Sequence, residues 1–454
     1  MGEHKRPGWL NVNTLPFAMG KLIIIGGRIL DPATGTSVEA EISIVGDLIA
    51  EIGPSLPRHA DDRIIDAGGC LVTPGLIDPH VHLREPGNER AETIASGSAA
   101  AVAGGFTSIC CMPNTTPALD TDTMMHFVAA RAAQTAHCRV FATGAVTKGR
   151  HGVELAELML MAQAGAVGFT DDGDCIASAG LMARALAAVK ATGRALMQHC
   201  QEPTMTRGGV MHAGEISARL DLGAWPRAAE EIIIERDVRL NRSVGCAYHV
   251  QHISSAGSVE IVRQARQQGQ NVSAEASPHH LLLTCDNIET SRYDTRYKMN
   301  PPLRESSDIA AIKEGIADGT ITVLGTDHAP HTHESKDVPF DTASFGLIGL
   351  ETAVPLYAKA LVDDGVIGWL RLIDMLTWQP AQLCGLDKAG LGRLAVGGPA
   401  DVTVINPSER WKIDDSCFAS KSRNTPFTGW NVSARVEATI VSGMVRLCRR
   451  GISR

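Results

Sequence analysis

Two kinds of hydrophobic pattern divide the chain. Near both ends, short runs of Ile, Val and Leu alternate with Gly, Asp and Pro, a pattern typical of β-strands joined by tight turns. The strands predicted there are Leu22–Ile25, Glu41–Val45, Leu48–Ile52, Asp401–Ile405, Arg435–Val441 and Met444–Leu447. Because these strands flank a different middle, we predict one small β-sandwich domain built from residues 21–73 and 391–450, preceded by a tail over residues 1–20.

The middle of the chain, residues 74–390, alternates short apolar runs with Ala-rich helical stretches. The helices are predicted over Ala91–Ala103, Gly180–Ala191, Ser258–Gln267 and Ile309–Ala317. Eight strands are predicted, at Leu76–His82, Thr107–Met112, Val140–Ala145, Ala166–Thr170, Ala195–His199, Ala247–Ile253, Asn271–Ala276 and Thr322–Thr326. Eight parallel βα units predict an α/β fold closed as a TIM barrel. A doubly wound open sheet is the alternative, but no G-x-G-x-x-G follows the first strand.

Polar residues recur where these strands end, which is the level at which a barrel carries its chemistry. They are His80, His82 and Arg84, then Asn114, Asp171 and Asp172, His199, His252, and finally Asp327, His328 and His331. Each alone has an ordinary explanation, since Asp-Asp-Gly can be a turn and a lone strand histidine is often bonded to a backbone carbonyl. Their recurrence at one level favours a shared site.

His80 and His82 stand two residues apart, so on an extended strand both imidazoles face the same side. Two neutral imidazoles converging at a strand end suit a cation such as zinc. Arg84 follows on the same parity, and its planar fork suits a carboxylate beside such a site.

Composition narrows the classes of partner. Lys and Arg number 42 against 50 Asp and Glu, without a basic stripe, and aromatic residues make up 4%, so a nucleic-acid partner is not expected. The eleven cysteines contain no C-x-x-C pair, which favours buried, reduced thiols in a cytoplasmic protein. The sequence shows neither a secretory leader nor an apolar run of membrane-spanning length, so no membrane association is expected.

Five longer motifs carry a resemblance to a known family. They are Asp78–Gly87, Met112–Thr115, Phe169–Gly173, Lys298–Arg304 and Gly325–His331. In this order, across residues 21–450, the chain resembles the type I dihydroorotases of the amidohydrolase superfamily. The resemblance implies a zinc enzyme that reversibly hydrolyses dihydroorotate to N-carbamoyl-aspartate in pyrimidine synthesis.

The resemblance also implies roles for individual residues. It makes His80, His82 and Asp327 ligands of one zinc and His199 and His252 ligands of a second, with Asp172 contributing to both. One or two zinc ions per subunit are therefore expected, with two favoured, and Asp327 would also move the proton. The expected substrate contacts are His82, Arg84, Asn114, Asn300 and His331, with the backbone of Phe345 and Gly346.

One departure bears on the choice of substrate. Hydantoinases, allantoinases and many dihydroorotases bridge their metals with a carboxylated lysine, but no lysine lies between Lys148 and Lys190, and Asp172 takes that place. A hydantoinase- or allantoinase-like amidase is one alternative, but the absent lysine and the presence of Arg84 count against it. A non-catalytic scaffold for aspartate transcarbamoylase is another, although such proteins lose metal ligands. The resemblance further implies a homo-oligomer and an association with aspartate transcarbamoylase, and the polar stretch 332–344 is long enough to be a lid.

Overall fold

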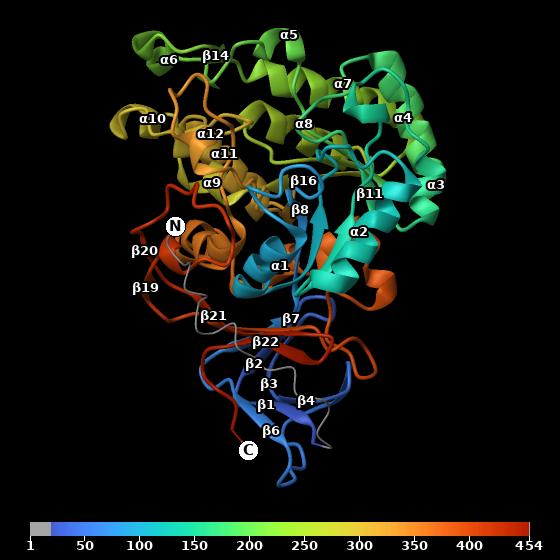
Figure 1. The fold of residues 1–454 in the computed structure, drawn as a ribbon, viewed down its shortest axis with the longest axis vertical. Helices are drawn as coiled ribbons and strands as arrows, with labels where there is room; N and C mark the ends of the chain where they lie inside the picture. The colour runs from blue at the N-terminus through green and yellow to red at the C-terminus, as the bar shows by residue number, and fades with distance from the viewer. Residues whose placement is uncertain (1–19, 454) are drawn as a thin grey trace.

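The structure is a computed structural model that describes residues 20–453. The predicted tail, apart from Gly20, lies outside the described residues. The fold is α/β, as predicted. Helix-covered parallel strands form the upper part of Figure 1, and β-sheets form the lower part, where strands from the start and the end of the chain lie together.

The lower part contains two sheets. One has the order β5 (Leu48–Gly53), β4 (Glu41–Val45), β1 (Leu22–Ile25), β6 (Arg63–Asp66). The other has the order β22 (Met444–Cys448), β21 (Arg435–Val441), β18 (Val402–Asn406), β7 (Leu71–Pro74), β2 (Arg28–Asp31), β3 (Thr36–Glu39). Its two halves join where β7 and β18 pair antiparallel, with Thr73 opposite Thr403. The Ile, Val and Leu side chains of both sheets share one core, so the two ends of the chain are packed together.

The upper part contains two parallel sheets. The first has the order β10 (Arg139–Ala142), β9 (Phe106–Cys111), β8 (Leu76–Val81). The second has the order β11 (Gly168–Phe169), β12 (Ala195–Gln198), β15 (Tyr248–Val250), β16 (Val272–Ala276), β17 (Val323–Leu324). Isolated parallel bridges, Gly144 with Phe169 and Val81 with His328, connect the two sheets at both edges.

All eight predicted strands are present, but seven end one to three residues earlier than predicted. The residues that follow these strands are no longer in the extended conformation. His252 has φ 30° and Asp327 has φ 49°, in the left-handed region that residues other than glycine seldom adopt. Apart from His80, which lies within β8, the polar residues therefore lie just beyond the strands.

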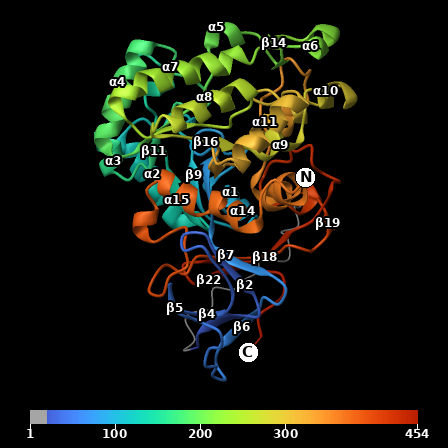
Figure 2. The same cartoon turned by 180° about the vertical axis from the view of Figure 1, so that it is seen from behind.

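Helices cover the outside of the parallel sheets, and the four predicted ones are present. The helices on the outside include α1 (Ile94–Ala103), α2 (Asp122–Thr135), α4 (Ala179–Thr192), α7 (Ala228–Val244), α8 (Ala256–Gln267) and α11 (Ser306–Ala317). Helix α1 begins after Thr93 because that side chain accepts from the Ser96 amide in a capping box. Figure 2 shows α14 (Trp369–Leu376) near the lower sheets, and it contacts both β2 and β8. None of the helices within residues 20–453 is long and apolar enough to cross a membrane.

Candidate metal centre and active site

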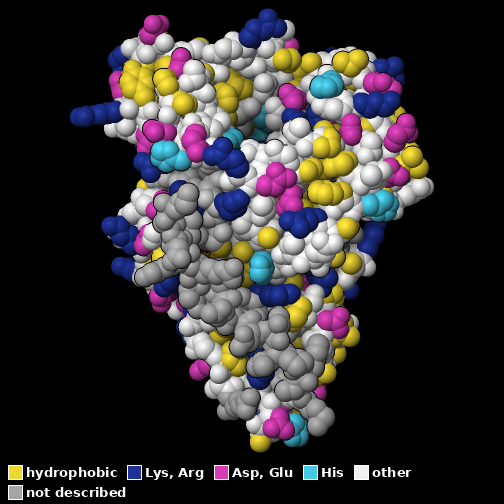
Figure 3. Space-filling model, in the orientation of Figure 1, with side chains coloured by type: hydrophobic (Ala, Val, Ile, Leu, Met, Phe, Trp, Pro, Cys, Tyr) yellow, Lys and Arg dark blue, Asp and Glu magenta, His cyan; other side chains and the backbone are white. Residues whose placement is uncertain are grey.

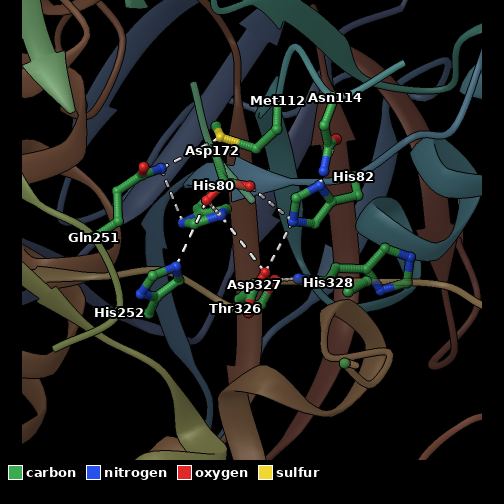
Figure 4. Close-up of polar contacts among 12 residues, drawn as sticks. His80, His82, Met112, Asn114, Asp172, Gln251, His252, Thr326, Asp327 and His328 are labelled. Atoms are coloured by element: carbon green, nitrogen blue, oxygen red, sulfur yellow. Dashed lines mark hydrogen bonds and ion pairs between the residues drawn. The ribbon is translucent and has the colours of Figure 1, made fainter. Parts of the chain in front are cut away.

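Four histidines surround the carboxylate of Asp172, and Figure 4 shows three of them, His80, His82 and His252. The distances from its oxygens to the nearest ring nitrogens are 3.3 Å for His80, 3.5 Å for His82, 3.5 Å for His199 and 3.6 Å for His252. The first two rings come from the end of β8, and the others follow β12 and β15. All five side chains are buried. Asp172 therefore joins two groups of three, one with His80 and His82 and one with His199 and His252.

The opposite side of three of these rings is bonded to an oxygen. His80 Nδ1 lies 2.5 Å from Glu275 Oε1, and His82 Nδ1 lies 2.8 Å from Asn114 Oδ1. His199 Nε2 lies 2.9 Å from Gln201 Oε1. A neutral imidazole that donates from one nitrogen keeps a lone pair on the other, and metal-bound histidines are usually oriented in this way. The nitrogens that face Asp172 are thus the ones suited to bind a cation.

Two of the atoms that face the centre of the cluster lack hydrogen-bond partners. Among the described residues, His80 Nε2 and Asp172 Oδ1 are buried without one. His199 Nδ1 and His252 Nε2 face each other at 2.8 Å, so one must donate to the other when no cation lies between them. Buried polar atoms are nearly always paired, so unpaired ones need a partner from outside the chain. Imidazole and carboxylate donors of this kind fit zinc.

Asp327 lies on the other side of the His80–His82 pair. Its Oδ1 is 3.0 Å from His82 Nε2 and 3.5 Å from His80 Nε2. Burial alone would raise the pKa of this carboxyl, but the contact with His82 Nε2 and the charge of His80 outweigh burial and hold the pKa below its usual value. Asp327 is therefore ionised, and its carboxylate is held in a left-handed turn directly beside the histidines.

Asp171 and Asp172 are adjacent but have different contacts. Asp171 accepts hydrogen bonds from the backbone amides of Val146 and Thr147 and from the Thr147 hydroxyl, so it fixes the turn between neighbouring loops. Asp172 points to the histidines. The turn and the cluster that the sequence left as alternatives for this segment both occur, on adjacent residues.

Arg84 lies near His331 at the edge of the cluster. Its Nε donates to the carbonyl of Pro330 at 3.1 Å, and its Nη2 is 3.5 Å from His331 Nε2. Its φ of 60° shows that the chain has already turned after His82, so Arg84 does not continue the strand as parity predicted. Burial lowers the pKa of the guanidinium to about 10, so Arg84 remains charged at neutral pH. Arg84 is half-buried and forms no ion pair with a carboxylate of residues 20–453, so it is suited to an anionic ligand.

His331 is committed to another bond. Its Nε2 lies 2.6 Å from the carbonyl of Phe345, and burial together with the charge of Arg84 lowers its pKa well below the usual value. The Gly346 amide donates to the carbonyl of Lys298 at 2.8 Å. A substrate contact by His331 Nε2 or by the Gly346 amide would therefore replace an existing hydrogen bond.

Asn300 and Asn114 each keep one amide atom available. Asn300 Nδ2 donates to Gln201 at 3.1 Å, whereas its Oδ1 is buried without a partner within the described part of the chain. Asn114 Oδ1 accepts from His82, which leaves its Nδ2 for a substrate. Figure 3 shows a hollow in the upper part of the molecule with histidine side chains at its bottom.

Three residues near the site were missed from the sequence. Gln201 bonds both His199 and Asn300, and Glu275 accepts from His80, from His249 Nε2 at 3.1 Å and from the His252 amide at 3.2 Å. Asn424 bonds the loop of His331 from a distant part of the chain. The only signal that could have found Glu275 was a carboxylate inside an apolar strand, whereas Asn424 had none.

The chain matches two family models, "Dihydro-orotase-like" over residues 69–258 and "Amidohydrolase family" over residues 245–446. A protein named dihydroorotase from Pelotomaculum thermopropionicum is 46% identical over 425 residues, covering 94% of this chain and 98% of that protein. A dihydroorotase from Geobacter sp. (strain M21) is 43% identical over 93% of this chain and 98% of its own length.

Among solved structures, L-hydantoinase (dihydropyrimidinase) from Arthrobacter aurescens superposes with a TM-score of 0.85 at 27% identity, over 96% of this chain and 98% of that one. D-hydantoinase from Thermus sp. gives 0.80 at 25% identity, over 95% and 96%. The fold thus matches those of hydantoinases over nearly all of the chain, while the higher sequence identity is to dihydroorotases. The chain belongs to the dihydroorotase family of amidohydrolases, enzymes that hydrolyse a cyclic amide bond.

Proposed function

We propose that this protein catalyses the reversible hydrolysis of (S)-dihydroorotate to N-carbamoyl-L-aspartate, a step of pyrimidine biosynthesis. The observation that carries the proposal is a set of four histidines and two carboxylates, two of whose inner atoms lack a hydrogen-bond partner among residues 20–453, beside the half-buried charge of Arg84. A cation-binding cluster next to a fixed guanidinium suits a cyclic amide that carries a carboxylate.

The residues assigned to hold zinc form two overlapping sets. His80, His82 and Asp327 would hold one ion, His199 and His252 a second, and Asp172 would contact both; we favour two zinc ions per chain. Bound zinc would polarise the amide carbonyl and lower the pKa of a water molecule. The outer hydrogen bonds to His80, His82 and His199 keep these rings in the tautomer that such binding needs.

Asp327 is assigned the proton transfer. Hydrolysis adds the oxygen of water to the ring carbonyl and breaks the carbon–nitrogen bond, so one proton must move from water to the leaving nitrogen. The ionised carboxylate of Asp327 can accept that proton at Oδ1 or Oδ2 and return it. The same carboxylate would serve ring closure in the reverse direction.

Arg84 is assigned the substrate carboxylate, with Asn114 and His331 as further donors. The Oδ1 of Asn300 is free to accept from a ring N–H. The backbone of Phe345 and Gly346, where the Phe345 carbonyl contacts His331, is assigned to the other ring amide. His82 lines the substrate site through its place beside Asp327.

A hydantoinase-like activity on a neutral ring is the second candidate, supported by the structural similarity to hydantoinases. Arg84→Met separates the two. If Arg84 binds the carboxylate, kcat/KM for dihydroorotate should fall by roughly 10²-fold or more, because a charge-assisted bond is lost and an anion is left unpaired. The value for 5,6-dihydrouracil, the same ring without the carboxylate, should change little. Equal losses on both rings would contradict this role for Arg84.

We also propose that the eight parallel strands form one closed TIM barrel over residues 74–390, which the two bridges between the sheets support. The β-sandwich domain would then comprise residues 21–73 and 391–450, supported by the pairing of β7 with β18. A cytoplasmic homo-oligomer that associates with aspartate transcarbamoylase completes the proposal. Light scattering of the purified protein, alone and mixed with that enzyme, tests the assembly.

A further inference from the structure

A segment near the C-terminus crosses the edge of the site. Residues 419–427, here called the C-terminal strap, run between the loop after β8 and the loop after β17. Ser422 Oγ donates to the carbonyl of Ala91 at 2.8 Å, and the Lys421 amide donates to Glu92 at 3.3 Å. At its other end, the Ile348 amide donates to the carbonyl of Asn424 at 3.1 Å. The strap thus bonds to the loops that follow the first and the last of the eight strands.

The side chain of Asn424 uses both ends of its amide on these loops. Its Nδ2 donates to the carbonyls of Ala329 at 2.9 Å and Gly346 at 3.1 Å. Its Oδ1 accepts from the His331 amide at 3.1 Å. Asn424 is buried, so these bonds do not compete with bulk water. One side chain therefore fixes residues 329–331 to Gly346 across a gap in the sequence.

Two of the three groups assigned to the substrate carboxylate, Arg84 and His331, depend on this loop. Arg84 Nε donates to the carbonyl of Pro330, which lies between the two loop residues that Asn424 bonds. His331 is itself bonded to Asn424 by its amide and to Phe345 by its ring. A shift of the 329–331 loop would displace the guanidinium and the imidazole together.

We propose that Asn424 is a positioning residue that sets the geometry of the subsite for the substrate carboxylate, without contacting the substrate. This inference rests on the proposed function. The physical reason is that two buried carbonyls need donors, and a neutral amide supplies both while accepting from the His331 amide. The strap thereby determines selectivity for an anionic ring, although it lies outside residues 74–390.

The test is Asn424→Asp, which keeps the size and the acceptor but places an oxygen against two carbonyl oxygens. The KM for dihydroorotate should rise on the order of 10- to 100-fold, while kcat stays within about threefold. The value of kcat/KM for 5,6-dihydrouracil and the zinc content should stay near those of the wild type. Asn241→Asp is the matched control, because Asn241 is a buried asparagine that bonds both the amide and the carbonyl of Cys246, away from the site.

An unchanged KM for dihydroorotate, an equal loss on both rings or a loss of zinc would overturn the inference. Asn424→Ser removes both donated bonds without adding a charge, and it provides the same comparison if the aspartate variant does not fold. A wild-type protein without activity on dihydroorotate would instead refute the proposed function. The two failures are therefore distinguishable.

Discussion

At the scale of single residues, the orientation of three of the four candidate histidine ligands depends on the group that is hydrogen-bonded to the outer ring nitrogen. Glu275 matters most, because its carboxylate bonds His80, the backbone of His252 and His249. Burial alone would raise its pKa, but His80 and His249 outweigh burial and keep it ionised. Glu275 therefore touches residues of both candidate metal groups.

Glu275→Gln removes this charge and leaves His80 free to take the other tautomer. Zinc affinity should weaken about 10- to 100-fold, as is usual when the residue behind a ligand is changed. Competition with a chelator on metal-free protein measures it. Glu351→Gln is the control, since Glu351 is a half-buried carboxyl bonded to the backbone of Ala419 and Ser420 and not to a candidate ligand. Equal affinities for wild type and Glu275→Gln would show that Glu275 does not support the metal centre.

Asp327→Asn tests the proton transfer at the same scale. The amide keeps an oxygen that can bind zinc but accepts no proton at neutral pH, so turnover should fall by ~10²–10⁴-fold in both directions. Zinc content should be largely retained. Asp237→Asn, which changes a buried carboxylate bonded to Tyr248 and Arg236, should leave turnover nearly unchanged. Near-normal turnover in Asp327→Asn with zinc bound would assign the proton transfer to another group.

At the scale of elements, hydrophobic periodicity was sufficient to predict the eight parallel strands and four of the helices, but it did not predict α2 or α7. It overestimated strand length, because the polar residues at strand ends adopt turns with positive φ instead of continuing the ladder. His80 and His82 could be predicted from parity alone, since β8 extends to Val81. The direction of Arg84 could not, because a turn follows His82.

The stretch 332–344, predicted as a lid, is bonded to its neighbours in the structure. It contains α12 (His333–Lys336), and Lys336 is buried with its Nζ donating to the carbonyls of Thr295 at 2.8 Å and Ser344 at 2.7 Å. Its opening during turnover stays a prediction. Burial, with the nearby charge of Lys298, lowers the pKa of Lys336 to about 7.

This pKa predicts a pH dependence of stability. An unfolded lysine titrates near pH ~10.4, so between about pH 7 and pH 10 the unfolded chain binds more protons and stability rises with pH. The free energy of unfolding of the wild type, relative to Lys336→Met, should increase by at most about 1.4 kcal/mol per pH unit in this range. Denaturant unfolding from pH 7.5 to 9.5 measures it. The exposed Lys388→Met should give a difference that does not change with pH, and the same flat result for Lys336→Met would contradict the prediction.

At the scale of the whole molecule, the sequence predicted which segments carry chemistry but not how the distant ones connect. The strand-end histidines and aspartates could be found because each follows an apolar run. Gln201 and Asn424 could not, because they act through contacts between loops that lie far apart in the sequence. The bonds of the C-terminal strap to Ala91 and Ala329 follow from the fold and leave no local pattern.

The most direct test of the account is a zinc titration of metal-free protein, followed by the rate of dihydroorotate hydrolysis at each ratio. We expect almost no hydrolysis without metal and a rate that rises until two zinc ions are bound per chain. Saturation at one ion would refute the two-zinc assignment. Hydrolysis that proceeds equally well without metal, or no hydrolysis of dihydroorotate at saturating zinc, would contradict the assignment of the protein as a zinc-dependent dihydroorotase.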